Sequence, residues 1–273
     1  MDMNAPRDRI SVLTPLEDDL GHTANVPTTP QTAHPNYRLP YVDPDYMRSD
    51  PLRGVRLQLE LDKPESVFRA AGVESTIVMF GGARIPRPED RDKAATPVLA
   101  ELADYYEEAR AFARIVTKES LHRGGGELVI CTGGGPGVME AGNLGAEEVG
   151  GRSIGLGIVL PHEQAPNLHV TPQLSLNFHY FAIRKMHFLM RAKAITVFPG
   201  GYGTLDELFE TLTLIQTERM ERMPVLLFGA DFWKRIVNWE ALADAGTISR
   251  GDLDLFEFVD SAEAAWEAIR HRV

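Results

Sequence analysis

The chain has 273 residues, 44% hydrophobic and 25% charged, which is long enough and apolar enough to bury a large core. Its formal net charge of −11 argues against a general affinity for nucleic acid or for anionic membranes. The single cysteine, Cys131, excludes an intramolecular disulfide, and no apolar run approaches the roughly 18 residues of a membrane-spanning helix. With no signal peptide visible, we expect a cytoplasmic protein without nucleic-acid or membrane partners.

Residues 1–50 differ in composition from the rest, because prolines recur among polar and acidic residues. Such a segment buries little apolar area, so we expect it to be disordered or draped over a neighbour. We expect residues 51–273 to form one α/β domain, which a helix over 56–71 begins. Short apolar, β-branched runs then predict strands at 76–80, 128–132, 154–160, 195–198 and 224–228, with a weaker sixth at 256–259.

Long helical stretches separate these runs. They lie near 95–122, 137–148, 178–193, 204–218, 231–243 and 261–271. This alternation predicts a doubly wound parallel sheet with helices on both faces. Ligands bind at the carboxyl ends of the strands in such folds, so the following loops are expected to carry the function. Three of these loops are rich in glycine: 81–84, 133–137 and 199–204.

Glycine-rich turns that lead into helices present backbone N–H groups and a positive helix end to an anion. The alternative is that the glycines only make tight turns; for two long loops at one sheet edge, we favour a phosphorylated ligand. No loop contains G-x-G-x-x-G, and Gly-Lys never occurs, which excludes a Walker A loop. Gly151–Gly155 matches G-x-S-x-G, but a helix precedes it and a strand follows, so we reject a serine nucleophile.

Two further features are charged. Arg184 and Lys185 lie inside the apolar segment 178–193, where a cation needs a partner, either a structural carboxylate or an anionic substrate. Thr204 and Glu207 have the spacing of a capping box, although a carboxylate beside a phosphate loop could also orient water or stabilise positive charge on a sugar carbon. Four histidines lie in one stretch: His162, His169, His179 and His187. Their spacing fits no common metal-binding motif, so we expect no metal.

Several of these motifs resemble the signature of the LOG ("Lonely guy") family. The family pattern is an Arg-Lys pair followed by PGGxGTxxE, which here corresponds to Arg184-Lys185 and residues 199–207. The loop 133–140 is similar to the family's GGGPGxME loop, and 80–84 to its FGSAR turn, with Gly82 in place of serine. The similarity spans about residues 75–250, and PGGxGTxxE is its specific part.

The resemblance implies a Rossmann-like fold and a phosphoribohydrolase that acts on nucleoside 5′-monophosphates without a metal or organic cofactor. It implies a catalytic arginine at Arg184, a catalytic glutamate at Glu207 and a homodimer or larger homo-oligomer. Phe188 and Lys193 depart from the family pattern. We expect the small-molecule nucleotide to be bound by Arg84, Gly134, Gly135, Gly137, Glu140, Lys185, Gly200, Gly201, Tyr202, Gly203, Thr204, Leu205 and Asp206.

Three other functions are compatible with the sequence. The first is a non-catalytic carrier of a nucleotide or phosphorylated cofactor, similar to molybdenum-cofactor carriers. The second is phosphoribosyl transfer, which would depend on pyrophosphate or Mg²⁺. The third, a nucleic-acid-processing module, is disfavoured by the charge of −11 and by the lack of a basic stripe.

Overall fold

The computed structural model describes residues 16–161 and 165–273, and its internal contacts divide the chain into one unit up to Arg56 and a second from Leu57 to Val273. The described part of the first unit consists of short helices in which no described side chain is buried. Proline opens most of them, as suits a residue without an N–H. They are α1 (Leu16–Ala24), η1 (Pro35–Tyr37), η2 (Pro40–Val42), α2 (Pro44–Arg48) and η3 (Asp50–Leu52). The predicted extension over 1–50 stays a prediction, since residues 1–15 lie outside the described residues.

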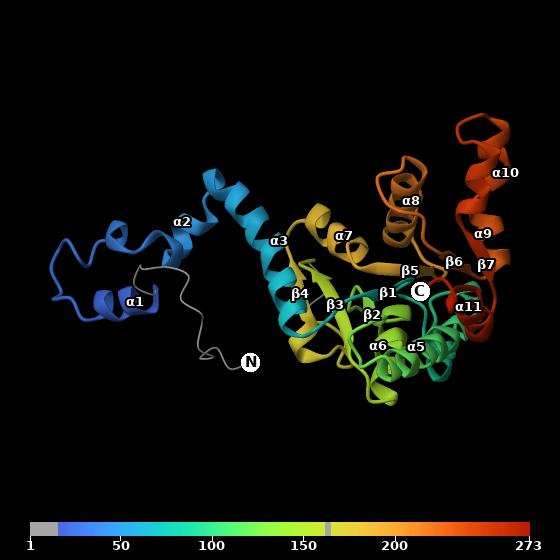
Figure 1. The fold of residues 1–273 in the computed structure, drawn as a ribbon, viewed down its shortest axis with the longest axis horizontal. Helices are drawn as coiled ribbons and strands as arrows, with labels where there is room; N and C mark the ends of the chain where they lie inside the picture. Colours follow the sequence, from blue (N-terminus) through green and yellow to red (C-terminus); the bar gives the residue numbers. More distant parts are fainter. Residues whose placement is uncertain (1–15, 162–164) are drawn as a thin grey trace. The chain divides into compact units, whose positions relative to one another are not determined.

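The second unit contains a seven-stranded parallel sheet in the order β4-β3-β2-β1-β5-β6-β7 (Figure 1). The predicted doubly wound α/β fold is thereby confirmed. The five central strands are apolar and largely buried, as a sheet covered on both faces requires. The strands are β1 (Thr76–Phe80), β2 (Val129–Thr132), β3 (Ser153–Ile158), β4 (Ser175–Phe178), β5 (Ala192–Val197), β6 (Val225–Phe228) and β7 (Glu257–Val259).

In the described part of the chain, eight α-helices follow α3 (Arg53–Ala70), which spans the boundary between the units. They are α4 (Pro97–Glu101), α5 (Asp104–His122), α6 (Val138–Glu148), α7 (Phe181–Leu189), α8 (Tyr202–Gln216), α9 (Ala230–Ile236), α10 (Trp239–Asp244) and α11 (Ala262–Ile269). Short 3₁₀ helices lie at η4 (Pro88–Lys93), η5 (Pro172–Leu174) and η6 (Arg250–Leu255).

Three of the predicted helices differ most from the observed ones. The helix expected over 178–193 is wrong at both ends, because β4 ends at Phe178 and β5 begins at Ala192. The helix expected over 95–122 is two helices, α4 and α5. The one expected over 231–243 is also two, since Val237 is extended and the Asn238 side chain accepts the N–H of Ala241 to cap α10.

The two faces of the sheet have separate cores because side chains alternate along each strand. Ile77 and Met79 of β1 pack with buried residues of α5, α6 and α11. Val78 and Phe80 point the other way, into a core that includes Phe68 of α3, Phe188 of α7 and residues of α8. Figure 1 shows α5, α6 and α11 together on one side of the strands.

The strand order reverses at β1. The chain proceeds from β1 outward to β4 on one side and returns as β5 on the other. The carboxyl ends of β1 and β5 therefore flank the topological switch point, where ligands bind in open α/β sheets. Two hydrogen bonds join these ends directly: Phe198 N donates to Phe80 O at 2.8 Å, and Gly82 N to Pro199 O at 2.9 Å. Among the described helices, none is long and apolar enough to cross a membrane.

Candidate functional site

A cleft of about 910 Å³ opens at this switch point. Its walls come from the loop after β1, from α7, and from the loop and first turns after β5. Apolar side chains such as Ile85, Leu99, Met139 and Phe232 line another part of it. The cleft brings together most of the residues predicted from sequence: Arg84, Arg184, Gly200, Gly201, Tyr202, Gly203, Thr204, Leu205, Asp206 and Glu207.

The amino end of α8 forms one wall of the cleft. The helix begins at Tyr202, and Gly201 precedes it without any side-chain cap. The first N–H groups of a helix have no intrahelical acceptor, and the end they occupy is electropositive. Gly200 makes the turn possible, because a Cβ there would lie 2.1 Å from Oγ1 of Thr204. This wall has the chemistry of an anion site.

Glu207 lies in the second turn of α8 and is only 8% exposed. The capping-box interpretation of Thr204 and Glu207 is wrong, because the helix starts two residues before Thr204 and carries no side-chain cap. Burial raises the pKa of Glu207 to about 7, while Arg184 and Lys185 partly oppose that rise. A buried carboxyl group that titrates near neutrality is a candidate for acid–base or electrostatic catalysis.

Arg184 reaches the cleft from α7. Its Nε donates to the carbonyl oxygen of Leu156 at 2.7 Å, and its guanidinium lies 5.0 Å from the ring centre of Phe188. Gly133 lies beneath it, since a Cβ on that residue would come within 2.6 Å of Nη2. The guanidinium is thus oriented by β3, by an aromatic ring and by the loop after β2.

A residue distant in sequence fixes the start of α7. Glu60 of α3 accepts the backbone N–H of His179 at 2.9 Å and that of Tyr180 at 3.0 Å. Tyr180 gives no side-chain cap to α7, and Glu60 instead holds the two residues that precede the helix. No local pattern in the sequence indicates a contact made from about 120 residues away.

The loop after β2 supports the cleft and contributes little of its surface. Gly133 lines the cleft together with Met139 of α6, whereas Gly134, Gly135 and Gly137 are buried behind it and do not line the cleft. Gly137 has φ of +68°, and a Cβ there would lie 2.4 Å from the carbonyl oxygen of Gly82. Close packing between the loops after β1 and β2 therefore requires glycine at this position.

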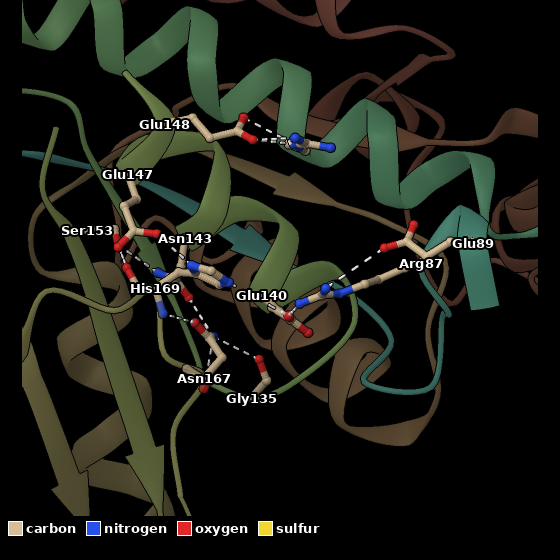
Figure 2. A network of polar contacts seen from close by, with 12 residues as sticks. Arg87, Glu89, Gly135, Glu140, Asn143, Glu147, Glu148, Ser153, Asn167 and His169 are labelled. Carbon is tan, nitrogen blue, oxygen red and sulfur yellow. Dashed lines mark hydrogen bonds and ion pairs between the residues drawn. The ribbon is translucent and has the colours of Figure 1, made fainter. Parts of the chain in front are cut away.

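Asn143 and Asn167 hold this loop from behind (Figure 2). The Asn167 amide donates to the carbonyl oxygens of Gly134 at 3.0 Å and Gly135 at 2.9 Å, and to Oδ1 of Asn143 at 2.9 Å. Asn143 is fully buried, accepts from Oγ1 of Thr132 at 2.8 Å and donates to Oγ of Ser153 at 3.0 Å. Sequence reasoning missed both asparagines, although an asparagine on the buried face of a helix signals a polar network.

Two residues that were predicted to bind the ligand, Glu140 and Lys185, do not line the cleft. Glu140 pairs with Arg87, and its Oε1 lies 3.9 Å from Nε2 of His169, as Figure 2 shows. Lys185 pairs with two carboxylates of α8.

Within the described residues, no group of three or more His, Cys, Asp or Glu side chains is placed to hold a metal ion; His162 lies outside them.

The sheet and the cleft at its switch point define a Rossmann-like α/β protein with a candidate ligand site on the β1 and β5 loops. The family model described as "Possible lysine decarboxylase" matches residues 139–269, a range that contains Arg184, Glu207 and the whole loop between β5 and α8. This match confirms the resemblance to the LOG family that the motifs indicate.

Solved structures that match the chain include the molybdenum cofactor binding protein of the phototrophic bacterium Rippkaea orientalis, at 19% identity and a TM-score of 0.47. The match covers 72% of this chain and 96% of that one. The molybdenum cofactor carrier protein of Chlamydomonas reinhardtii is 18% identical, with a TM-score of 0.45, 72% of this chain and 97% of that chain covered. No curated protein matches the chain in sequence.

Proposed function

We propose that the protein hydrolyses the N-glycosidic bond of a nucleoside 5′-monophosphate to a free base and ribose 5-phosphate. The observation that carries this proposal is the buried carboxyl group of Glu207, which shares one cleft with Arg184 and with the uncapped end of α8. A site that only bound a phosphorylated ligand would gain little from a carboxylate beside the phosphate.

The amino end of α8 takes the 5′-phosphate. Its N–H groups and the glycines before it allow close approach of an anion, and Arg84 supplies positive charge on the β1 side. Of the two glycine loops, the one after β5 lines the cleft, while the loop after β2 places Gly133 beneath Arg184. The phosphate role therefore falls mainly on residues 200–204.

The ionised carboxylate of Glu207 acts on the sugar. As the bond from C1′ to the base nitrogen breaks, C1′ gains oxocarbenium character, which a nearby carboxylate stabilises while it positions water. The water oxygen bonds to C1′. One of its protons ends on the base nitrogen, and the other stays on the new hydroxyl group of ribose 5-phosphate. Arg184 anchors the substrate or assists the departing base.

The test uses purified protein in EDTA with AMP, other nucleoside monophosphates and isopentenyladenosine monophosphate, followed by chromatography of the products. We expect free base and ribose 5-phosphate in equal amounts, and no cleavage of adenosine, which lacks the phosphate. Glu207→Gln and Arg184→Ala should each abolish turnover while the fold remains intact. Glu263→Gln, an exposed position on α11, serves as the matched control and should retain full activity.

Other outcomes of the same experiment point to different functions. Tight binding of nucleotides without cleavage would reject hydrolysis and favour a carrier. If cleavage appears only after Mg²⁺ replaces EDTA or pyrophosphate is added, phosphoribosyl transfer would be favoured. Near-normal turnover in both Glu207→Gln and Arg184→Ala would refute the roles given to these residues. The expected homodimer or larger assembly stays a prediction, to be checked by light scattering.

A further inference from the structure

Lys185 lies between two carboxylates of the helix that carries Glu207. Its Nζ is 3.0 Å from Oδ2 of Asp206 and 2.8 Å from Oε2 of Glu210. The Lys185 side chain is only 14% exposed, so its ammonium group is committed to these contacts. Burial by itself lowers the pKa of this lysine, but its ion pairs with Glu210 and Asp206 outweigh burial and raise it. The ammonium group is therefore charged at neutral pH.

The positions of these three residues link the two proposed catalytic groups. On α7, Lys185 directly follows Arg184. On α8, Asp206 directly precedes Glu207, and Glu210 lies one turn further along. The two ion pairs thus join α7 to α8 on either side of Glu207. A shift of either helix would change the distance between the guanidinium group and the carboxyl group.

The same contacts control the charge around Glu207. Three carboxyl groups lie within five residues at the start of α8, and repulsion from Glu210 and Asp206 raises the pKa of Glu207. Lys185 opposes this through its own charge and through its pairs with both neighbours. The charged groups that face Glu207 or share its cleft are Arg184 and Lys185 of α7, Asp206 and Glu210 of α8, and Arg84 after β1.

We propose that Lys185 is a positioning residue, which fixes α7 against α8 and neutralises the two carboxylates beside Glu207. This inference rests on the proposed function. It replaces the substrate-binding role expected from the sequence, because Lys185 is absent from the cleft-lining residues of the described chain. In this role the lysine contacts no substrate. It favours the ionised form of Glu207 and sets the spacing of this carboxyl group from Arg184.

Two measurements test the inference on Lys185→Met, with Lys118→Met, an exposed lysine of α5, as the matched control. The first is the titration of Glu207 in the empty protein, followed by carboxyl carbon NMR and assigned by the signal lost in Glu207→Gln. The second is steady-state kinetics. We expect the Glu207 midpoint to move to higher pH in Lys185→Met only. We also expect kcat to fall about 10- to 100-fold, with KM changed less than about twofold.

A rescue variant separates electrostatics from folding. In Lys185→Met combined with Asp206→Asn and Glu210→Gln, the flanking charges are gone, so the Glu207 midpoint should return toward the wild-type value. Lys185→Arg keeps the charge and should keep the midpoint. An unchanged midpoint in Lys185→Met, or a raised KM with unchanged kcat, would overturn the inference. If the wild type lacks activity but the midpoint shifts as expected, the proposed function fails and the effect of Lys185 on Glu207 stands.

Discussion

Arg184 and Leu156 are joined by a hydrogen bond of 2.7 Å from Nε of the arginine to the leucine carbonyl oxygen. One edge of the guanidinium group is therefore held by β3, and the group lines the cleft. A lysine cannot reproduce this, because it has a single charged nitrogen and no planar fork.

We accordingly expect Arg184→Lys to lower kcat/KM for the nucleotide by about 100-fold or more, although the positive charge is retained. Steady-state kinetics on wild type and variant check this, with circular dichroism as the control for folding. Activity within threefold of wild type would mean that charge alone is needed at this position, and the anchoring by Leu156 would be irrelevant.

The pKa of Glu207 predicts how activity depends on pH. If its carboxylate stabilises the oxocarbenium centre, kcat/KM should fall about tenfold per pH unit below about pH 7, where the group becomes protonated in the empty cleft. A pH profile from pH 5 to pH 9 checks this. A profile that is flat over this range would show that the ionisation of Glu207 does not affect kcat/KM.

The same carboxyl group should make the folded state less stable as pH rises. Its pKa is about 7 in the folded protein against a reference value of 4.5, so the folded state binds the proton more tightly. Stability from this group is therefore present below about pH 4.5 and is lost as pH rises toward 7. Glu207→Gln cannot ionise, and it should be more stable than wild type at pH 8 by at most about 3 kcal/mol.

Urea unfolding at pH 4, 6 and 8 measures this difference, which should vanish at pH 4. Glu263→Gln, at an exposed site, is the control and should show no pH-dependent gain. Equal stability of Glu207→Gln and wild type at pH 8 would contradict a desolvated carboxylate at this position.

Two glycines of the β5–α8 loop should respond oppositely to alanine. A Cβ at Gly200 would lie 2.1 Å from Oγ1 of Thr204, whereas a Cβ at Gly203 would meet nothing within 4 Å. Gly200→Ala should cost about 1–3 kcal/mol through crowding. Gly203→Ala should leave stability unchanged or raise it by up to about 1 kcal/mol, since alanine favours the helix. Thermal unfolding of the empty protein distinguishes the two.

The sequence was sufficient for the parts of the fold whose signals are local. β1 and β6 are continuous apolar runs, so their positions follow from composition alone. β4 was missed because it lies at the sheet edge, alternates between exposed and buried positions and contains Ser175 and Asn177. The start of α8 was placed two residues late, because Thr204 has the residue type of a cap and Gly201 supplies none.

In the candidate site, too, the sequence predicted the features with local signals and missed those that depend on packing. Glycine loops, Arg184 and Glu207 were found because motif spacing and the carboxyl ends of parallel strands place them together. The true partners of Lys185 were not found, because the pairing depends on how α7 packs on α8. Asn143 and Glu60 were missed for the same reason, since each acts on residues brought near only by the folded sheet.

Burial of Glu207 has a consequence for how ligands are measured. At neutral pH the empty cleft is a mixture of molecules with and without a proton on this carboxyl group, because its pKa is about 7. An anion that enters the cleft adds negative charge beside Glu207 and shifts the mixture toward the protonated form. Binding would then draw protons from the buffer. The heat measured by calorimetry would depend on the buffer's ionisation enthalpy, so the ligand and the proton would have to be counted together.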